Sequence, residues 1–107
     1  MKFLEELFKV AEEKYQCDND KDFKRIKIKY DYFTILIGEI EKRELYVKIK
    51  RGNNCVECLF NFKTLQEMFN ENVNNILDFI IYRTIEYYYA ERCKNCYRKE
   101  NIKWDID

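Results

Sequence analysis

The longest run of regularly spaced apolar residues lies between Thr64 and about Arg92. Apolar side chains recur there at steps of three and four residues, which places them on one side of a helix. Glu67 follows Thr64 at the spacing of a capping box, so the pattern predicts a helix that begins at Leu65. No Gly or Pro interrupts the run, and we expect one helix over 64–96 whose apolar stripe alone covers about 28 residues, or on the order of 40 Å. The predicted core stripe consists of Leu65, Phe69, Val73, Ile76, Leu77, Ile80, Ile81, Thr84, Tyr87 and Tyr88.

A second amphipathic pattern opens the chain, with Leu4, Leu7 and Phe8 on one face and Glu5 and Glu12 on the other. It predicts a helix over 1–17. The run Cys17–Asp22 should end this helix, because Asp and Asn favour turns over helix interiors.

Between these helices the apolar residues alternate with polar ones, which is the period of a half-buried strand. The segments are 24–30, 33–40, 45–50 and 55–62. Only Asp31 separates the first two, so they form either two strands or one long bulged strand. Short connections make neighbouring strands antiparallel.

These patterns together predict an α+β fold, built as a single two-layer domain over 1–107. It has an N-terminal helix, an antiparallel meander of about four strands over 24–62, a long C-terminal helix and a tail over 97–107.

The composition limits the kinds of catalytic site that the chain can form, because it has neither His nor Ser. Ser–His and Cys–His nucleophilic sites are therefore excluded, and we expect a protein that is not an enzyme. No apolar stretch approaches the length of a membrane span, and the charged N-terminus does not resemble a signal peptide. We expect a cytoplasmic protein that does not contact a membrane.

Two CxxC pairs, with 34 residues between them, are the sharpest motif. Cys55, Cys58, Cys93 and Cys96 could supply four thiolates to one structural zinc. The alternative is that no cofactor binds and that the thiols are ordinary reduced side chains. In a regular strand Cys55 and Cys58 fall on opposite faces, which favours this alternative.

The net charge is zero, yet residues 23–51 hold nine Lys and Arg against four acids. Cationic side chains with interleaved aromatics on strands can contact phosphates and stack bases. Lysines at outward strand positions also protect sheet edges from aggregation, so the pattern has two interpretations. The candidate residues for binding nucleic acid or an acidic patch are Arg25, Lys27, Lys29, Tyr46, Lys48, Lys50 and Arg51.

The outer face of the long helix is the third candidate, because it carries aromatic and acidic residues in place of the usual Lys and Glu. Exposed Tyr with a few charges is typical of interface hot spots. The alternative is that helix 1–17 or the tail, with Ile102, Trp104 and Ile106, covers this face. The candidate partner-binding residues are Asp78, Phe79, Tyr82, Glu86 and Tyr89.

The sequence therefore favours a non-enzymatic protein that binds another protein. In its small size, Tyr-rich surface and segregated charge the chain is similar in type to phage- or mobile-element-encoded inhibitors of host machinery, such as anti-CRISPR proteins. The likeness covers no motif. The alternatives are a zinc-stabilised nucleic-acid-binding module that uses the basic sheet face, and a homodimer that pairs through the long helices.

Overall fold

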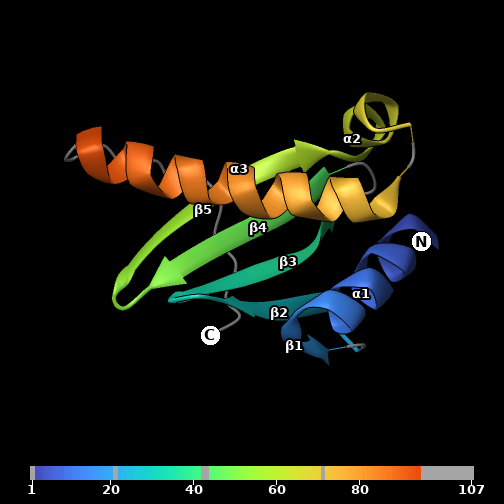
Figure 1. The fold of residues 1–107 in the computed structure, drawn as a ribbon, viewed down its shortest axis with the longest axis horizontal. Coiled ribbons are helices and arrows are strands. Elements are labelled where there is room, and N and C mark those ends of the chain that lie inside the picture. Colours follow the sequence, from blue (N-terminus) through green and yellow to red (C-terminus); the bar gives the residue numbers. More distant parts are fainter. Residues whose placement is uncertain (1, 21, 42–43, 71, 95–107) are drawn as a thin grey trace.

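The computed structural model describes residues 2–20, 22–41, 44–70 and 72–94 (Figure 1). Five strands form one sheet in the order β1-β2-β3-β4-β5, and every neighbouring pair is antiparallel. The predicted α+β class, meander and terminal helices are confirmed, with a fifth strand added. The elements are α1 (Lys2–Lys14), β1 (Gln16–Asp20), β2 (Arg25–Tyr30), β3 (Phe33–Glu41), β4 (Glu44–Arg51), β5 (Asn54–Asn61), α2 (Phe62–Met68) and α3 (Val73–Lys94).

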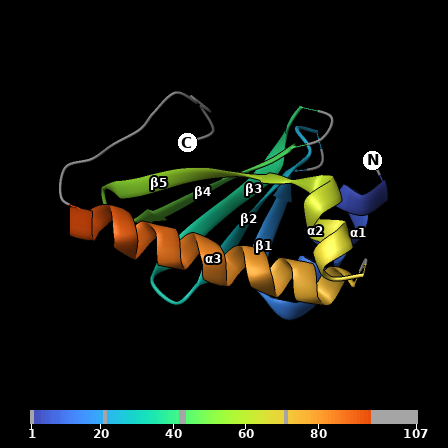
Figure 2. The ribbon, with the colours of Figure 1, turned by 90° about the horizontal axis from the view of Figure 1, so that it is seen from above.

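The helices lie on one face of the sheet, which gives the two predicted layers (Figures 1 and 2). Helix α3 crosses this face and contacts α1, β4 and β5. It runs antiparallel to β5, since Phe79 packs on Phe60 while Thr84, further along α3, meets Cys58. The fully buried side chains between the layers are Leu7, Ala11, Ile28, Ile35, Ile37, Leu45, Val47, Ile49, Ile76, Leu77, Ile80 and Ile81.

Strand β1 lies where the sequence predicted a turn, so that prediction is wrong. Its residues have low strand propensity, but pairing with β2 places carboxylates beside cations: Asp18 opposite Lys27 and Asp20 opposite Arg25. The Arg25 and Asp20 side chains approach to 3.6 Å. The favourable cross-strand charge pairs therefore outweigh the preference of these residues for turns. As a result the sheet extends over 16–61 rather than 24–62.

The segment 24–40 forms two strands rather than one bulged strand. The chain reverses at the two-residue turn of Asp31 and Tyr32, and Asp31 adopts a left-handed backbone with φ of 55°. Asp tolerates this backbone region better than most residues, so Asp31 alone can form the turn that separates the two strands.

The predicted long helix is two helices, and the predicted capping box does not cap either one. Asn61 is the N-cap of α2, and its side-chain oxygen accepts from the Thr64 amide at 2.9 Å. Asn70 then takes a left-handed φ of 50°. The oxygen of Asn72 accepts from the Asn75 amide at 3.1 Å, in the position of a cap for α3. Two asparagines, Asn70 and Asn72, rather than Gly or Pro, therefore divide the helical pattern.

The assignment of the cap gives a stability prediction. We expect Asn61→Ala to lower the free energy of unfolding by about 1 kcal/mol, because an amide in the first turn of α2 loses its acceptor. Thr64→Ala should change it by less than half as much. Urea denaturation of both variants measures this difference, and a larger loss in Thr64→Ala would show that Thr64 is the cap.

Candidate functional site

Asp78 was predicted to face a partner, and the structure places it against α1. The Lys14 ammonium donates to both Asp78 oxygens, at 2.9 and 3.1 Å, and the Tyr15 hydroxyl donates to Oδ1 at 2.9 Å. Burial and this bond to the carboxylate raise the pKa of Tyr15. The Asp78 carboxylate therefore fastens α1 to α3, and a role for it in partner binding stays a prediction.

Phe79 is likewise engaged within the fold. Its ring centroid lies 6.3 Å from that of Phe60 on β5 and 5.2 Å from that of Phe69 after α2. The Arg83 guanidinium lies 5.4 Å from the Phe79 ring centroid. The side chain is half-buried, so it supports the junction of α2, α3 and β5 and offers little area to a partner.

Tyr82 and Tyr89 do lie at the surface, with 56% and 47% of their area exposed. They lie near aromatic residues at the end of β2 and in the β2–β3 turn: the Tyr82 ring centroid lies 6.4 Å from that of Tyr30, and Tyr32 is 79% exposed. Arg51 joins Tyr89 to Tyr32, because its Nη1 donates to the Tyr89 hydroxyl at 3.3 Å and its guanidinium lies 5.4 Å from the Tyr32 ring centroid. We call Tyr30, Tyr32, Arg51, Tyr82 and Tyr89 the tyrosine surface.

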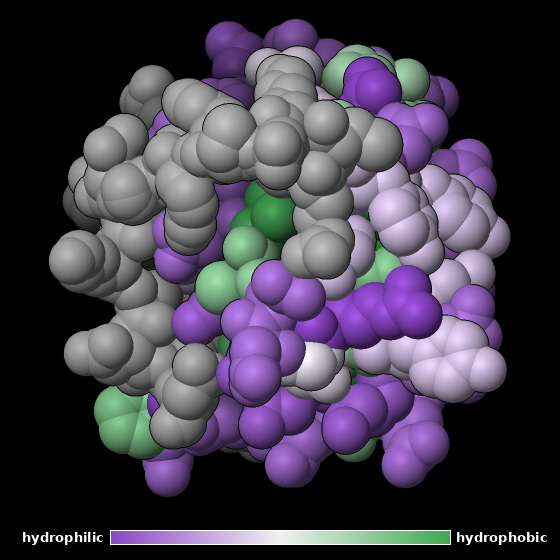
Figure 3. Space-filling model, turned by 90° about the vertical axis from the view of Figure 1, so that its left-hand side faces the viewer, coloured by the Kyte–Doolittle hydropathy of each residue, from purple (hydrophilic) through white to green (hydrophobic). Residues whose placement is uncertain are grey.

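This surface lies at the end of the molecule seen in Figure 3, where pale, weakly polar side chains gather beside strongly hydrophilic ones. Sequence patterns do not place Tyr30 and Tyr32 beside the helix residues, because that placement depends on where α3 crosses the sheet. Glu86 is exposed and pairs with Arg83 at 3.2 Å.

The aromatic rings of the tyrosine surface are held by packing. Tyr89 contacts Phe33 and Tyr88, with centroid separations of 6.0 and 5.5 Å and nearly perpendicular rings. A hydrogen bond with Tyr82 and partial burial raise the pKa of Tyr30. Rings fixed in this way lose little rotamer freedom on binding, which favours affinity.

The predicted basic face is smaller than expected, because one of its residues lies on the other face of the sheet and another is buried. Arg51 turns to the helix side of the sheet, among Tyr32, Phe33 and Tyr89. Tyr46 faces the outer side but is fully buried, so its ring cannot stack on a base. Its hydroxyl donates to Glu57, and burial raises its pKa.

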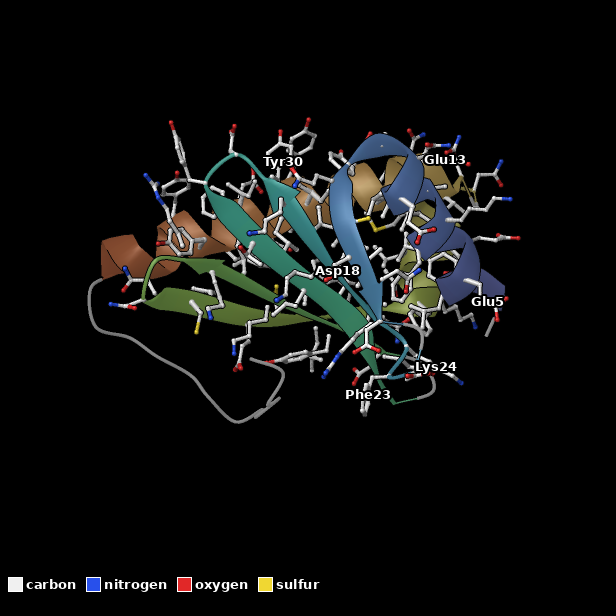
Figure 4. All side chains as sticks on the ribbon, turned by 90° about the horizontal axis from the view of Figure 1, so that it is seen from below. Glu5, Glu13, Asp18, Phe23, Lys24 and Tyr30 are labelled. Carbon is white, nitrogen blue, oxygen red and sulfur yellow. The ribbon has the colours of Figure 1, made fainter. Side chains whose placement is uncertain are left out.

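The remaining cations form rows across the outer face of the sheet. Figure 4 labels Asp18 on β1. One row runs Asp18, Lys27, Leu36, Lys48 and Glu57, so an acid lies at each end. The adjacent row joins Lys29, Thr34 and Lys50 and ends in uncharged Gln16 and Cys55. Along this register only the first of the two rows ends in acidic residues.

The structure separates the two thiols of the first CxxC pair. Cys55 lies in the outer-face row and Cys58 on the helix side, where its thiol meets the Thr84 hydroxyl at 3.8 Å. Burial raises the pKa of Cys58 to about 11. The Cys93 side chain and Cys96 lie outside the described residues, and within those residues no cluster of His, Cys, Asp or Glu could hold a metal. Zinc binding stays a prediction.

The environment of Cys58 predicts its reactivity. At pH 8 we expect iodoacetamide to alkylate Cys58 in the native protein on the order of a hundredfold more slowly than a free thiol, because almost none of it is thiolate. Cys55, on the outer face, should react faster. Peptide mass mapping over time measures both rates, with and without a zinc chelator. Protection of Cys55 that disappears with the chelator would contradict this account and favour a shared metal.

No protein-family model, curated protein or solved structure matches this chain. Among the described helices, none combines the length and apolar character that crossing a membrane requires. Fold and site define a small α+β protein with an exposed aromatic surface where α3 meets the β2–β3 turn.

Proposed function

We propose that this chain is a non-enzymatic binding protein that holds a protein partner on its tyrosine surface. The observation that carries the proposal is the combination of exposure and order: Tyr32, Tyr82 and Tyr89 are 47–79% exposed, while Arg51 and neighbouring rings hold them in place. A helix face that contacts only water usually carries charged or polar side chains rather than large aromatic rings.

The residue types suit this function. Tyr and Arg are enriched among the few interface residues that supply most of the binding free energy. Here four Tyr and one Arg, from α3, β2, β4 and the β2–β3 turn, form one surface. The ring faces offer apolar area, and the hydroxyls and guanidinium can pair with polar groups at the rim.

The chemistry of the thiols and the composition support a role other than catalysis. The chain lacks Ser and His, and the thiol of Cys58 is kept protonated by its raised pKa of about 11. The buried phenol of Tyr46 is likewise kept protonated by the pKa shift that burial causes. Neither group is suited to act as a nucleophile or base at neutral pH.

The specific role we propose is inhibition of host machinery in the cytoplasm, of the kind that anti-CRISPR proteins carry out. Small size and a preformed aromatic surface support it, since an inhibitor needs to occupy a site and needs no chemistry of its own. Expression of the chain in a host with active interference against a phage should raise the number of plaques. An unchanged plaque count across the interference systems of that host would contradict the inhibitor role.

Substitution of the two helix tyrosines tests the binding surface directly. We expect Tyr82→Ala and Tyr89→Ala each to weaken binding to the protein that the chain captures from host extract by more than about 1 kcal/mol. Isothermal titration calorimetry with the purified partner measures the change.

Tyr87→Ala is the matched control, because Tyr87 is 41% exposed on the same helix but lies beside Arg83, away from the tyrosine surface. It should bind as the wild type does. Wild-type affinity in both Tyr82→Ala and Tyr89→Ala would refute the assignment, as would an equal loss in Tyr87→Ala.

A further inference from the structure

A hollow of about 530 Å³ is bordered by α1 and by β1, the strand at one edge of the sheet. Leu4 and Phe8 of α1 line it together with Asn19 of β1. Glu5 on α1 and Lys24, just before β2, also line it, and Figure 4 labels both. Pockets for small molecules typically measure roughly 300–1,000 Å³, so the hollow is large enough to hold one.

The amide of Asn19 has one end bound and one end free. Pairing with Ile26 places Asn19 on the helix side of the sheet, where its Nδ2 donates to Oε2 of Glu12 at 3.1 Å. Because a carboxylate only accepts hydrogen bonds, this contact also fixes which end of the amide is the nitrogen. The other end, Oδ1, is buried and has no hydrogen-bond partner among the described residues.

This free acceptor indicates what a ligand has to supply. A buried carbonyl oxygen without a partner raises the free energy of the folded state, because it has lost its water and gained nothing in return. The carboxylate of Glu12 beside it likewise offers only acceptor oxygens. A ligand that complements this wall of the hollow therefore carries an N–H or O–H donor.

The rest of the lining is mainly apolar. Leu4 and Phe8 belong to the core and are almost fully buried, so they form an apolar floor. Glu5, Lys9 and Lys24 are exposed, and their side chains carry apolar stems below the charged groups. A ligand in the hollow thus gains most of its contact area from apolar atoms.

The charges of the lining cancel. Of the described residues that border the hollow, Glu5 and Glu12 are acidic, and Lys9 and Lys24 are basic. Charges of alternating sign give no strong net field, so neither a cation nor an anion is drawn in by the hollow as a whole. An uncharged ligand is favoured.

We propose that this hollow binds a small uncharged molecule that is mainly apolar and carries a hydrogen-bond donor for the Asn19 Oδ1. An indole ring is a simple group of this class, since its only polar atom is an N–H donor. No described residue of the hollow belongs to the tyrosine surface, so the proposal does not rest on the proposed protein partner.

Two isomers of methylindole test the proposal, because 3-methylindole has the N–H donor and 1-methylindole lacks it. We expect 3-methylindole to bind at least about fivefold more tightly, since a site with a buried acceptor rejects an analogue without the donor. Titration followed by ¹H–¹⁵N NMR measures both dissociation constants. The amide signals that shift should include those of Phe8, Glu12 and Asn19.

Three outcomes of this titration would overturn the proposal. The first is no saturable binding of 3-methylindole at millimolar concentration. The second is equal binding of the two isomers, which would indicate that water satisfies the Asn19 Oδ1. The third is a set of shifts confined to Tyr82, Tyr89 and their neighbours, which would place the ligand on the tyrosine surface.

Asn19→Ala removes the acceptor and should bind the two isomers alike. The matched control is Asn54→Ala, which removes the same amide from an exposed position at the start of β5 and should keep the wild-type preference. The NMR spectrum of each variant also reports whether it keeps the fold. A preference retained in Asn19→Ala, or lost equally in both variants, would overturn the assignment of the acceptor.

Charged relatives of the probe test whether the ligand is uncharged. Tryptamine and indole-3-acetate add a cation and an anion to the same ring, and both should bind more weakly than 3-methylindole. Tighter binding of tryptamine would identify a cation site at Glu5 and Glu12. Tighter binding of indole-3-acetate would identify an anion site at Lys9 and Lys24, and either result would overturn the proposal.

Discussion

The packing of α3 across the sheet is the interaction on which the rest of the structure depends. Thr84 and Phe79 of α3 meet Cys58 and Phe60 of β5, which sets the antiparallel crossing. Apolar burial dominates this contact, since Ile76, Leu77, Ile80 and Ile81 are fully buried. Because α3 crosses in this direction, its later turns arrive above Phe33 and Arg51, and Tyr89 joins the residues of the β2–β3 turn.

The outer face of the same sheet follows a different constraint, which is the pairing of charges in register. Asp18 opposite Lys27 and Asp20 opposite Arg25 make β1 a strand and also neutralise one end of the face. The row that holds Lys29 has no such acid. The pairing that gives β1 its place therefore also decides which row of the outer face carries an acid on β1.

Much of this fold could be predicted from the sequence, because period-2 and period-3.6 patterns report directly on what is buried. The helix break could not, since Asn70 and Asn72 give weaker signals than the Gly or Pro that usually end helices. The fifth strand was missed for a similar reason. The residues 17–20 favour a turn when considered alone, and their pairing with the more distant residues of β2 makes them a strand.

The candidate site was only half predictable. Helical spacing found Tyr82 and Tyr89, which are exposed, but it could not show that the neighbouring Asp78 meets Lys14 and Tyr15. Strand alternation correctly predicted that Tyr46 points to the outer face, but it could not show that the side chain is buried there. Arg51 was assigned to the outer face although alternation along β4 places it with Val47 and Ile49 on the helix side, where it contacts Tyr89. For Asp78 and Tyr46 the missing information was which other element packs nearby.

Site-specific photocrosslinking in host cells tests the central claim most directly, that the tyrosine surface holds a protein partner. With p-benzoylphenylalanine in place of Tyr82, Tyr89 or Tyr87, the account predicts one adduct of defined mass at the first two positions. Tyr87 lies roughly 140–160° from them around α3, so it should give no adduct. An adduct at Tyr87 as strong as at Tyr82, no adduct at either predicted position, or an adduct of twice the chain mass would contradict the account.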